Sequence, residues 1–252
     1  MKTIINLFQA LLVLLVLNSC DSGQQYRIMT YNVKCARGMD NVLDYDRTAK
    51  VIADINPDIV ALQELDSMTT RSGETITGEE LADRVGMHFT FAKAIDFGGG
   101  GYGVGVFSKE QPIRNEKFPL PGGDEPRVLL LLEFERYFLL ATHFSLHQQD
   151  RVESVNTILE LLAILKDKPT ILCGDLNAEP DNEIIAQLNT QCKLLSDTTI
   201  NTFPADTPNR VLDYIYGYNA NIPKTNFTLH NSVVVDEPLA SDHRPVYIDV
   251  KF

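Results

Sequence analysis

The chain has 252 residues, with 34 acidic and 22 basic side chains and a formal net charge of −12 at pH 7. Binding to duplex DNA or to anionic lipid headgroups is largely neutralisation of phosphate by lysine and arginine, so this charge disfavours a protein that binds either one non-specifically. A local arginine cluster would still allow a nuclease. The length fits one two-sheet sandwich domain, and we find neither a short repeat nor a low-complexity linker.

The first twenty residues have the pattern of an export signal. A basic start is followed by an apolar run at residues 7–17 and then by Asn18-Ser19-Cys20. A run this short is typical of a signal peptide rather than of a membrane span. The end of the run resembles a bacterial lipobox, in which Cys20 carries the lipid; ordinary cleavage without lipid is the alternative. The chain is thus predicted to divide into a signal peptide at 1–19, a spacer at 20–25 and a single domain at 26–252.

The remaining cysteines do not indicate a disulfide framework. With Cys20 assigned to a lipid, three are left, and that number is odd. Cys173 lies in an apolar run and is most simply a small core residue. A single Cys35–Cys192 bridge stays open, and no cysteine or histidine spacing is typical of a zinc site.

The first predicted elements end in polar residues. Residues 26–32 form a predicted strand that ends in Asn32, and residues 44–54 have the apolar spacing of a helix. A buried strand is expected at 59–62, with Glu64 just beyond its exit. A glutamate directly after four apolar residues is costly to bury unless it is paired or bound to a cation. Glu64 is therefore a candidate metal ligand.

A loop and a helix are expected next. The loop at 65–73 carries Arg71, whose planar fork matches phosphate oxygens, although a solvated arginine fits the pattern nearly as well. The helix at 78–86 has Thr77 as its expected N-cap and ends at a glycine.

A glycine-rich stretch follows the strand expected at 89–94. Residues 98–103 contain five glycines and are predicted to form a mobile surface loop. They are not a P-loop, because neither a lysine nor a helix start follows. Tyr102-Gly103 precedes the strand expected at 104–108, and from its place alone the tyrosine could be an edge aromatic that packs on the loop.

The middle of the chain predicts two adjacent strands and a long helix. The strands are expected at 127–133 and 136–142, and His143 follows the second. Arg127 at the start of the first strand faces a cleft or forms a surface ion pair; both readings stay open. Residues 148–165 place their apolar side chains on one helical face.

The last third contains the two most specific motifs. A core strand at 170–173 leads into Gly174-Asp175-Leu176-Asn177, and strand alternation puts Asp175 and Asn177 on one side. Asp213 lies in the strand expected at 211–215. Ser241-Asp242-His243 forms a loop before the final strand at 246–250, and a loop tip on a rigid strand suits a catalytic histidine.

Taken together, these apolar runs ending in polar residues resemble the endonuclease/exonuclease/phosphatase superfamily, which includes deoxyribonuclease I. Six motifs occur in the order of that family, and the resemblance covers residues 27–252. It implies a four-layer α/β sandwich, in which two facing mixed β-sheets are flanked by helices and the active site lies at their rim. The motifs that carry the resemblance contain Asn32, Glu64, His143, Asp175 with Asn177, Asp213, and Asp242 with His243.

The resemblance implies a role for each of these side chains. Glu64, with Asp242 as a further ligand, would hold Mg²⁺ or Mn²⁺, and Asp175 and Asn177 would position the attacking water. His243, oriented by Asp213, would bind phosphate or exchange a proton. His143 would aid the leaving group, and a histidine there is less typical of the AP-endonuclease branch. The implied phosphate-binding residues are Asn32, Arg71 and Tyr102, of which Asn32 lies beside the metal site and bonds either the catalytic aspartate or the phosphate.

The expected function is that of a divalent-metal-dependent phosphoesterase using in-line water attack without a covalent enzyme intermediate. It is expected to be monomeric and lipid-anchored in the bacterial cell envelope, outside the cytoplasm. The substrate class stays open among nucleic acids, phospholipid headgroups and phosphosugars. Two alternatives remain: an extracellular endonuclease or exonuclease, and a non-catalytic binding protein on the same fold.

Overall fold

The computed structural model describes residues 23–220 and 227–252. The expected signal peptide and Cys20 lie outside these residues. Among the helices described, none is both long and apolar enough to span a membrane.

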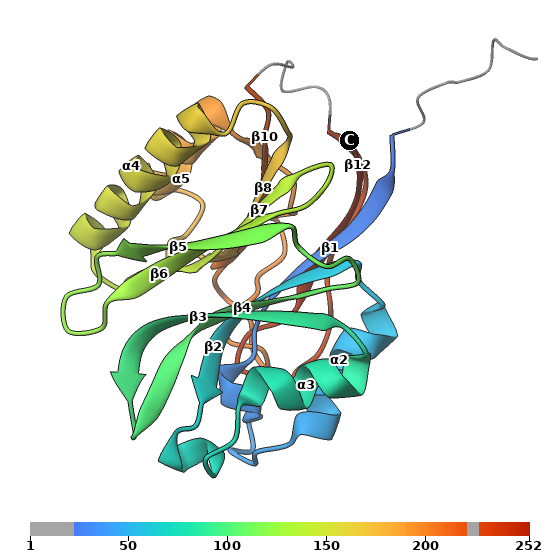
Figure 1. Ribbon diagram of the computed structural model, residues 1–252, viewed down its shortest axis with the longest axis vertical. Coiled ribbons are helices and arrows are strands. Elements are labelled where there is room, and N and C mark those ends of the chain that lie inside the picture. Colours follow the sequence, from blue (N-terminus) through green and yellow to red (C-terminus); the bar gives the residue numbers. More distant parts are fainter. Residues whose placement is uncertain (1–22, 221–226) are drawn as a thin grey trace, which may run out of the picture.

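The first sheet has six strands and two covering helices (Figure 1). The strand order is β11 (Thr228–Val234), β12 (Val246–Lys251), β1 (Gln25–Asn32), β2 (Ile59–Ser67), β4 (Gly100–Ser108) and β3 (His88–Phe97). Only the β1–β2 pair is parallel, so the sheet is mixed. Apolar side chains of α2 (Tyr45–Ile55) and α3 (Thr77–Val85) pack on its outer face.

The second sheet repeats this construction. Its order is β5 (Arg114–Leu120), β6 (Arg127–Glu133), β7 (Phe138–His143), β8 (Thr170–Asp175), β10 (Asp213–Tyr218) and β9 (Lys193–Leu194). Here β7 and β8 are the parallel pair. The helices α4 (Gln148–Ile164) and α5 (Glu183–Gln191) cover its outer face.

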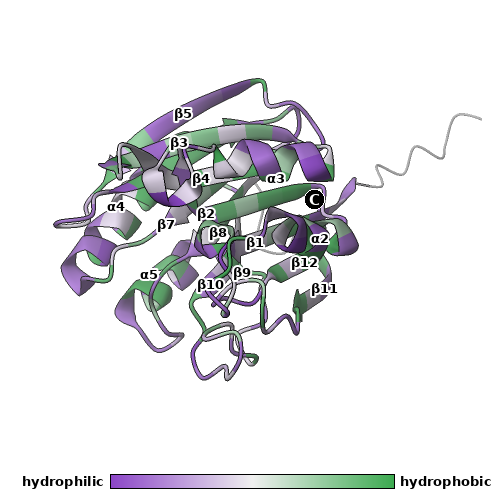
Figure 2. Ribbon diagram, turned by 90° about the horizontal axis from the view of Figure 1, so that it is seen from below, coloured by the Kyte–Doolittle hydropathy of each residue, from purple (hydrophilic) through white to green (hydrophobic). Residues whose placement is uncertain are grey.

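The two sheets face each other across a central apolar core. Alternate residues of each strand enter it, such as Ile28 and Ala61 from the first sheet and Leu130 and Ile171 from the second. The colours of Figure 2 show hydrophobic strands inside and hydrophilic helix faces outside. The predicted four-layer α/β sandwich is therefore confirmed.

The glycine-rich stretch differs from its prediction. Residues 98–103 do not form a mobile loop, because Gly100 already begins β4 and only Gly98 and Gly99 make the turn of the β3–β4 hairpin. Both turn residues have positive φ, at 53° and 85°, which glycine adopts without strain. At Gly103 a Cβ atom would lie 2.0 Å from the carbonyl oxygen of Ala92, so this glycine permits close strand approach.

Two smaller expectations are also settled. Thr77 is not the N-cap of α3: Ile76 holds that place in an extended conformation, because it is bridged to Ser67 of β2. Cys35 and Cys192 form no disulfide with each other, and both are buried, as is Cys173.

Candidate active site

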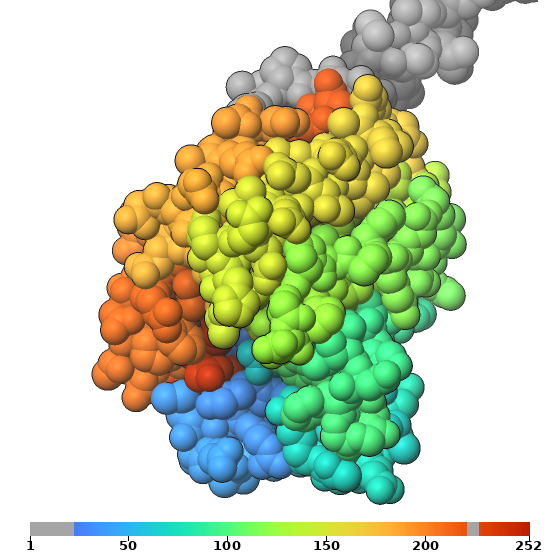
Figure 3. Space-filling view, turned by 90° about the vertical axis from the view of Figure 1, so that its left-hand side faces the viewer, coloured from blue at the N-terminus to red at the C-terminus, as the bar shows by residue number. Residues whose placement is uncertain are grey.

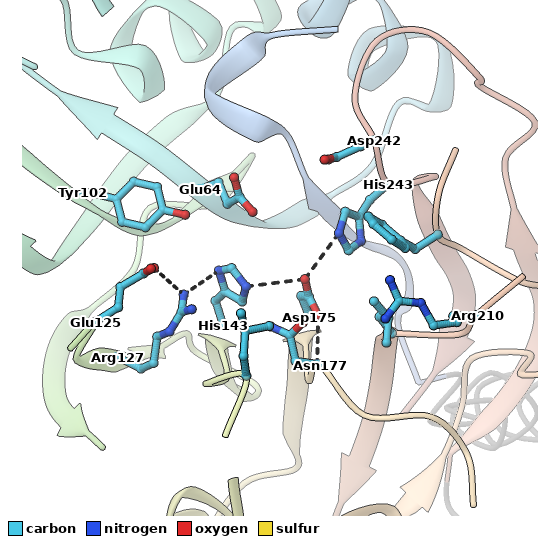
Figure 4. Close-up of a pocket in the computed structure, with 13 residues that line it drawn as sticks. Glu64, Tyr102, Glu125, Arg127, His143, Asp175, Asn177, Arg210, Asp242 and His243 are labelled. Atoms are coloured by element: carbon cyan, nitrogen blue, oxygen red, sulfur yellow. Dashed lines mark hydrogen bonds and ion pairs between the residues drawn. The ribbon is translucent and has the colours of Figure 1, made fainter. Parts of the chain in front are cut away.

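The candidate active site is a pocket of about 380 Å³ at the rim of the sandwich. It lies where residues from both sheets and from the loop before β12 converge. Figure 3 shows the N-terminal, middle and C-terminal parts of the chain meeting at this face of the molecule. Figure 4 shows the polar side chains pointing into the hollow.

The pairing register of β7, β8 and β10 determines the positions of the first group of site residues. Parallel pairing of β7 with β8 places His143 beside Asp175, and antiparallel pairing of β8 with β10 places Asp175 beside Asp213. These three buried residues thus form a row across neighbouring strands. Strand pairing thus brings residues of three separate sequence motifs together in one site.

His243 completes this row from the loop before β12. Its Nδ1 lies 2.9 Å from Oδ2 of Asp213, the contact that the family resemblance implied, and its Nε2 lies 3.5 Å from Oδ2 of Asp175. Burial by itself lowers the pKa of His243, but the two carboxylates outweigh this and raise it to about 10. At neutral pH the ring is therefore a cation, fixed by one carboxylate and directed at another.

Asp175 is the centre of the hydrogen-bond network. Its Oδ1 accepts the backbone N–H of Asn177 at 2.9 Å, and its Oδ2 accepts Nδ2 of Asn32 at 3.1 Å. Burial raises the pKa of Asp175, and the charge of Asp213 raises it further, whereas His243 lowers it. A buried carboxylate with a raised pKa suits proton abstraction from water near neutral pH.

Glu64 reaches the pocket through a distortion of β2. The strand does not end at residue 62 as predicted; it continues to Ser67 across a register shift between Leu62 and Leu65. Glu64 itself has φ of +60°, in the left-handed region that non-glycine residues rarely adopt. Such bulges re-aim a side chain, and backbone strain of this kind clusters at functional sites.

One buried amide joins the two sheets at the site. Nδ2 of Asn32, at the end of β1, donates to Oε1 of Glu64 at 2.9 Å as well as to Asp175. Of the two partners that the resemblance implies for Asn32, the aspartate and the phosphate, the structure shows the aspartate: Asn32 is fully buried and lies behind these carboxylates rather than on the pocket surface.

Glu64 and Asp242 have the properties of ligands for a hard divalent cation. Glu64 forms no ion pair with any lysine or arginine in the part of the chain that the structure describes, and burial raises its pKa despite the bond from Asn32. Such a carboxylate is stabilised by a cation. Asp242 lines the same pocket and contacts Nζ of Lys34 at 3.2 Å. Carboxylate oxygens of this kind fit Mg²⁺ or Mn²⁺.

A second group of possible ligands lies nearby. Asp175, Asp213 and His243 offer ligand atoms within 4.8 Å of one another. Both ring nitrogens of His243, however, are already directed at carboxylates, Nδ1 at Asp213 and Nε2 at Asp175. Glu64 and Asp242 therefore fit a cation better than this group does.

His143 is held in one tautomer by Arg127. Nη1 of Arg127 lies 3.1 Å from Nδ1 of His143, and a guanidinium can only donate, so Nδ1 accepts. Burial and the charge of Arg127 lower the pKa of His143 well below its usual range. The proton of the neutral ring is then on Nε2, which lies 3.5 Å from Oδ2 of Asp175. His143 can thus donate a hydrogen bond from this atom.

The other predicted residues differ in their positions. Tyr102 lines the pocket, and Figure 4 shows its hydroxyl directed inward. Asn177 also lines it, and its Nδ2 donates to the carbonyl oxygen of Phe144 at 2.9 Å. Arg71 does not line this pocket. It lies in an adjoining hollow, bound to Asp66.

Several residues at the pocket were not selected from the sequence: Glu125, Leu146, Phe203 and Leu212, together with the ion-pair partner Lys34. Arg210, which also lines the pocket, matches the basic residue that the resemblance implies just before Asp213. For Arg127 both readings left open by the sequence hold, because this arginine lines the pocket and, only 7% exposed, also forms an ion pair. Glu125 is the partner, at 3.0 Å. Nothing in the sequence around the remaining residues marks them as part of a site.

Comparison with known proteins agrees with this geometry. Residues 29–243 match the Endonuclease/Exonuclease/phosphatase family. A search of the curated proteins gave no match.

Solved structures share the fold at low sequence identity. The endonuclease/exonuclease/phosphatase from Beutenbergia cavernae is 21% identical with a TM-score of 0.75, over 91% of this chain and 72% of its own. The mannosyl-6-phosphatase from Bacteroides thetaiotaomicron is 18% identical with a TM-score of 0.71, over 90% and 100%. The human Nocturnin catalytic domain, with bound sulfate, is 20% identical with a TM-score of 0.70, over 90% and 94%.

Proposed function

Because this chain belongs to the endonuclease/exonuclease/phosphatase family, whose members are phosphoesterases, we propose that it hydrolyses a phosphoester with the help of Mg²⁺ or Mn²⁺. The observation that carries the proposal is the buried Asn32 amide, which joins Glu64 of one sheet to Asp175 of the other. It sets a candidate metal ligand beside a candidate base. In this proposal Glu64 holds the cation, with Asp242 as a further ligand.

Each side chain has a definite task in the proposed reaction. A bound divalent cation would supply stabilisation of the negative charge on the phosphoryl and leaving oxygens. Asp175 accepts the proton of the attacking water, and Asn177 orients that water. His243, as a cation fixed by Asp213, donates to a phosphoryl oxygen.

The leaving-group side of the reaction is assigned to His143. It donates a hydrogen bond from Nε2 as a neutral ring, rather than delivering a proton as an imidazolium, because Arg127 occupies Nδ1. Among the described residues that line the pocket there is no serine or cysteine to act as a nucleophile, which supports direct attack by water.

Two alternative functions have less support. An extracellular nuclease shares all of this chemistry, but the net charge of −12 disfavours a long polyanionic substrate. A non-catalytic binding protein would not need the complete set of Glu64, Asp175 and the Asp213–His243 pair.

The proposal is tested by an assay of metal-dependent turnover. Purified protein lacking its first 20 residues is incubated with Mg²⁺, Mn²⁺ or EDTA and with bis-p-nitrophenyl phosphate, plasmid DNA, RNA, phosphoinositides and sphingomyelin. We expect turnover of one class with metal and none with EDTA. Turnover that is equal in EDTA, or silence across the panel from a folded protein, would overturn the proposal.

We also propose that Cys20 anchors the protein to the bacterial envelope through a lipid, on the strength of the lipobox-like sequence. Full-length protein expressed in a bacterium is expected to take up labelled palmitate and to sediment with membranes. Cys20→Ser is expected to abolish the label and release the protein, whereas Cys35→Ser should keep both. Equal labelling of wild type and Cys20→Ser would exclude the anchor.

A further inference from the structure

A second, smaller hollow of about 110 Å³ adjoins the catalytic pocket. It is lined by Arg71, Ile95, Phe97, Tyr102 and Glu125. Tyr102 and Glu125 line the catalytic pocket as well, so the two hollows meet at these side chains. Figure 4 shows both residues on the side of the pocket opposite His243 and Arg210. A group attached to a phosphate in the catalytic pocket can therefore extend into this hollow.

Arg71 is fixed in this hollow by three neighbours. Its Nε and Nη2 donate to the two oxygens of buried Asp66 at 2.7 and 2.8 Å. Its guanidinium carbon lies 4.3 Å from the ring centroid of Phe97 and 5.3 Å from that of Tyr102. Arg71 therefore keeps one orientation, with Nη1 as the nitrogen that is not used on Asp66.

The segments that carry Arg71 and Phe97 are tied together. Phe97 ends β3 at the hairpin, and Arg71 lies in the short 3₁₀ turn η2 (Thr70–Ser72). The backbone N–H of Thr70 donates to the carbonyl oxygen of Gly98 at 2.8 Å. The two walls thus form one preformed surface, on which Phe97 stays 40% exposed although Arg71 lies over it.

The charges in the hollow compensate one another. Asp66 neutralises Arg71, and Glu125 pairs with Arg127 at 3.0 Å. The side chain of Glu125 is still 46% exposed, so its carboxylate would repel a second phosphate group. The group that fits is uncharged, accepts a hydrogen bond from Arg71 and donates one to Glu125.

Ring geometry separates a sugar from a nucleobase. A flat base stacks best between parallel aromatic faces, but the rings of Phe97 and Tyr102 are tilted by 49° with centroids 6.0 Å apart. A pyranose instead offers an apolar C–H face to one exposed ring and hydroxyl groups at its edge. Those hydroxyls match the donor of Arg71 and the acceptor of Glu125.

We propose that the substrate is a phosphate ester of a sugar, with its phosphate in the catalytic pocket and its ring on Phe97. This inference rests on the proposed phosphoesterase function and adds the substrate class. Phe97, Arg71 and Glu125 select the sugar and take no part in the chemical step.

The test compares matched substrates that differ only in the ring. Hexose 6-phosphates and their p-nitrophenyl diesters are compared with methyl phosphate and methyl p-nitrophenyl phosphate, in the presence of Mg²⁺ or Mn²⁺. Thymidine 5′-phosphate and its p-nitrophenyl ester represent the nucleotides. The variants are Phe97→Ala, Phe97→Tyr, which keeps the ring, and the control Ile113→Ala. Ile113 is exposed and bonds to Glu133, at the end of β6 that is far from Arg127 and the hollow.

Wild-type protein is expected to prefer the hexose compound over its methyl partner in kcat/KM. Phe97→Ala should reduce that preference by about tenfold, the size of one lost packing contact, while Phe97→Tyr and Ile113→Ala retain it. Equal preference in wild type and Phe97→Ala, or a wild-type preference for the thymidine compound, would overturn the sugar assignment. No turnover of the methyl compounds or of any other compound would instead refute the proposed function itself.

Discussion

Replacing Asp175 by asparagine is expected to lower kcat by about 10³-fold, the contribution of a positioned general base. Asparagine has the same shape, and its carbonyl oxygen can still accept the N–H of Asn177. It cannot accept a proton from water, and its amide nitrogen would face the donating Nδ2 of Asn32. The loss should therefore appear in kcat and not only in KM.

A second measurement separates the loss of a base from a misplaced site. The carboxylate of Asp175 is one of the causes that raise the pKa of His243 to about 10. The His243 pKa, followed by NMR, is therefore expected to fall in Asp175→Asn. The control is Asp167→Asn. Asp167 is exposed and lies just before β8 begins, at the other end of this strand from Asp175, so its substitution should change neither kcat nor the pKa of His243. If Asp175→Asn kept more than about a tenth of wild-type kcat, the base would have to be another group.

Much of the fold is readable from apolar periodicity. The strand at 127–133 has the bounds predicted for it, and α4 ends one residue before its predicted end. Both segments are long, regular and bounded by prolines or polar residues, so local pattern and tertiary packing agree. The layered arrangement itself came from the family resemblance, since periodicity does not specify which strands pair.

Local pattern fails where the site distorts the fold. The bulge that turns Glu64 toward the pocket interrupts β2, so the apolar run ends at residue 62 while the strand continues. The glycines after Phe97 have loop composition, yet from Gly100 onward they belong to a strand whose neighbours leave no room for side chains. In both cases the cause lies on another strand, and a sequence window cannot contain it.

Contacts between distant segments decide what the sequence left open or missed. The two readings of Arg127 could not be separated by sequence, because its role depends on Nδ1 of His143, 16 residues away. Phe97 becomes significant only because η2 brings Arg71 over its ring. The Asp213–His243 pair spans 30 residues and was expected only because the family resemblance supplied it.

The proposed metal site makes a prediction about stability that is independent of turnover. Glu64→Gln keeps the shape of the side chain and an oxygen that can accept from Asn32, so the fold should persist. Without its charge, binding of Mg²⁺ or Mn²⁺ should be strongly weakened. Activity at low metal concentration is then expected to fall by about 10³-fold, as for the loss of several kcal/mol of charge stabilisation.

The sign of the stability change should depend on the metal. Burial raises the pKa of Glu64 in the folded protein, so the folded state holds its proton more tightly than the unfolded state does. Protonated Glu64 therefore stabilises the folded state fully only below the pKa that Glu64 has in the unfolded chain. This contribution to the free energy of unfolding is lost as the pH rises through the pKa of Glu64 in the folded protein. In EDTA at pH 7, Glu64→Gln should therefore be at least as stable as wild type.

Added metal should reverse that order. A cation that binds only the folded wild type stabilises it by mass action, and its contribution grows with metal concentration. Thermal unfolding is measured for both proteins in EDTA and at increasing Mn²⁺ concentrations. The plots of Tm against Mn²⁺ concentration for wild type and Glu64→Gln are expected to cross. Asp66→Asn is the matched control, since this buried carboxylate pairs with Arg71 instead of facing the pocket; it should lose stability with or without metal. If Mn²⁺ raised the Tm of wild type and Glu64→Gln equally, Glu64 would not hold the cation.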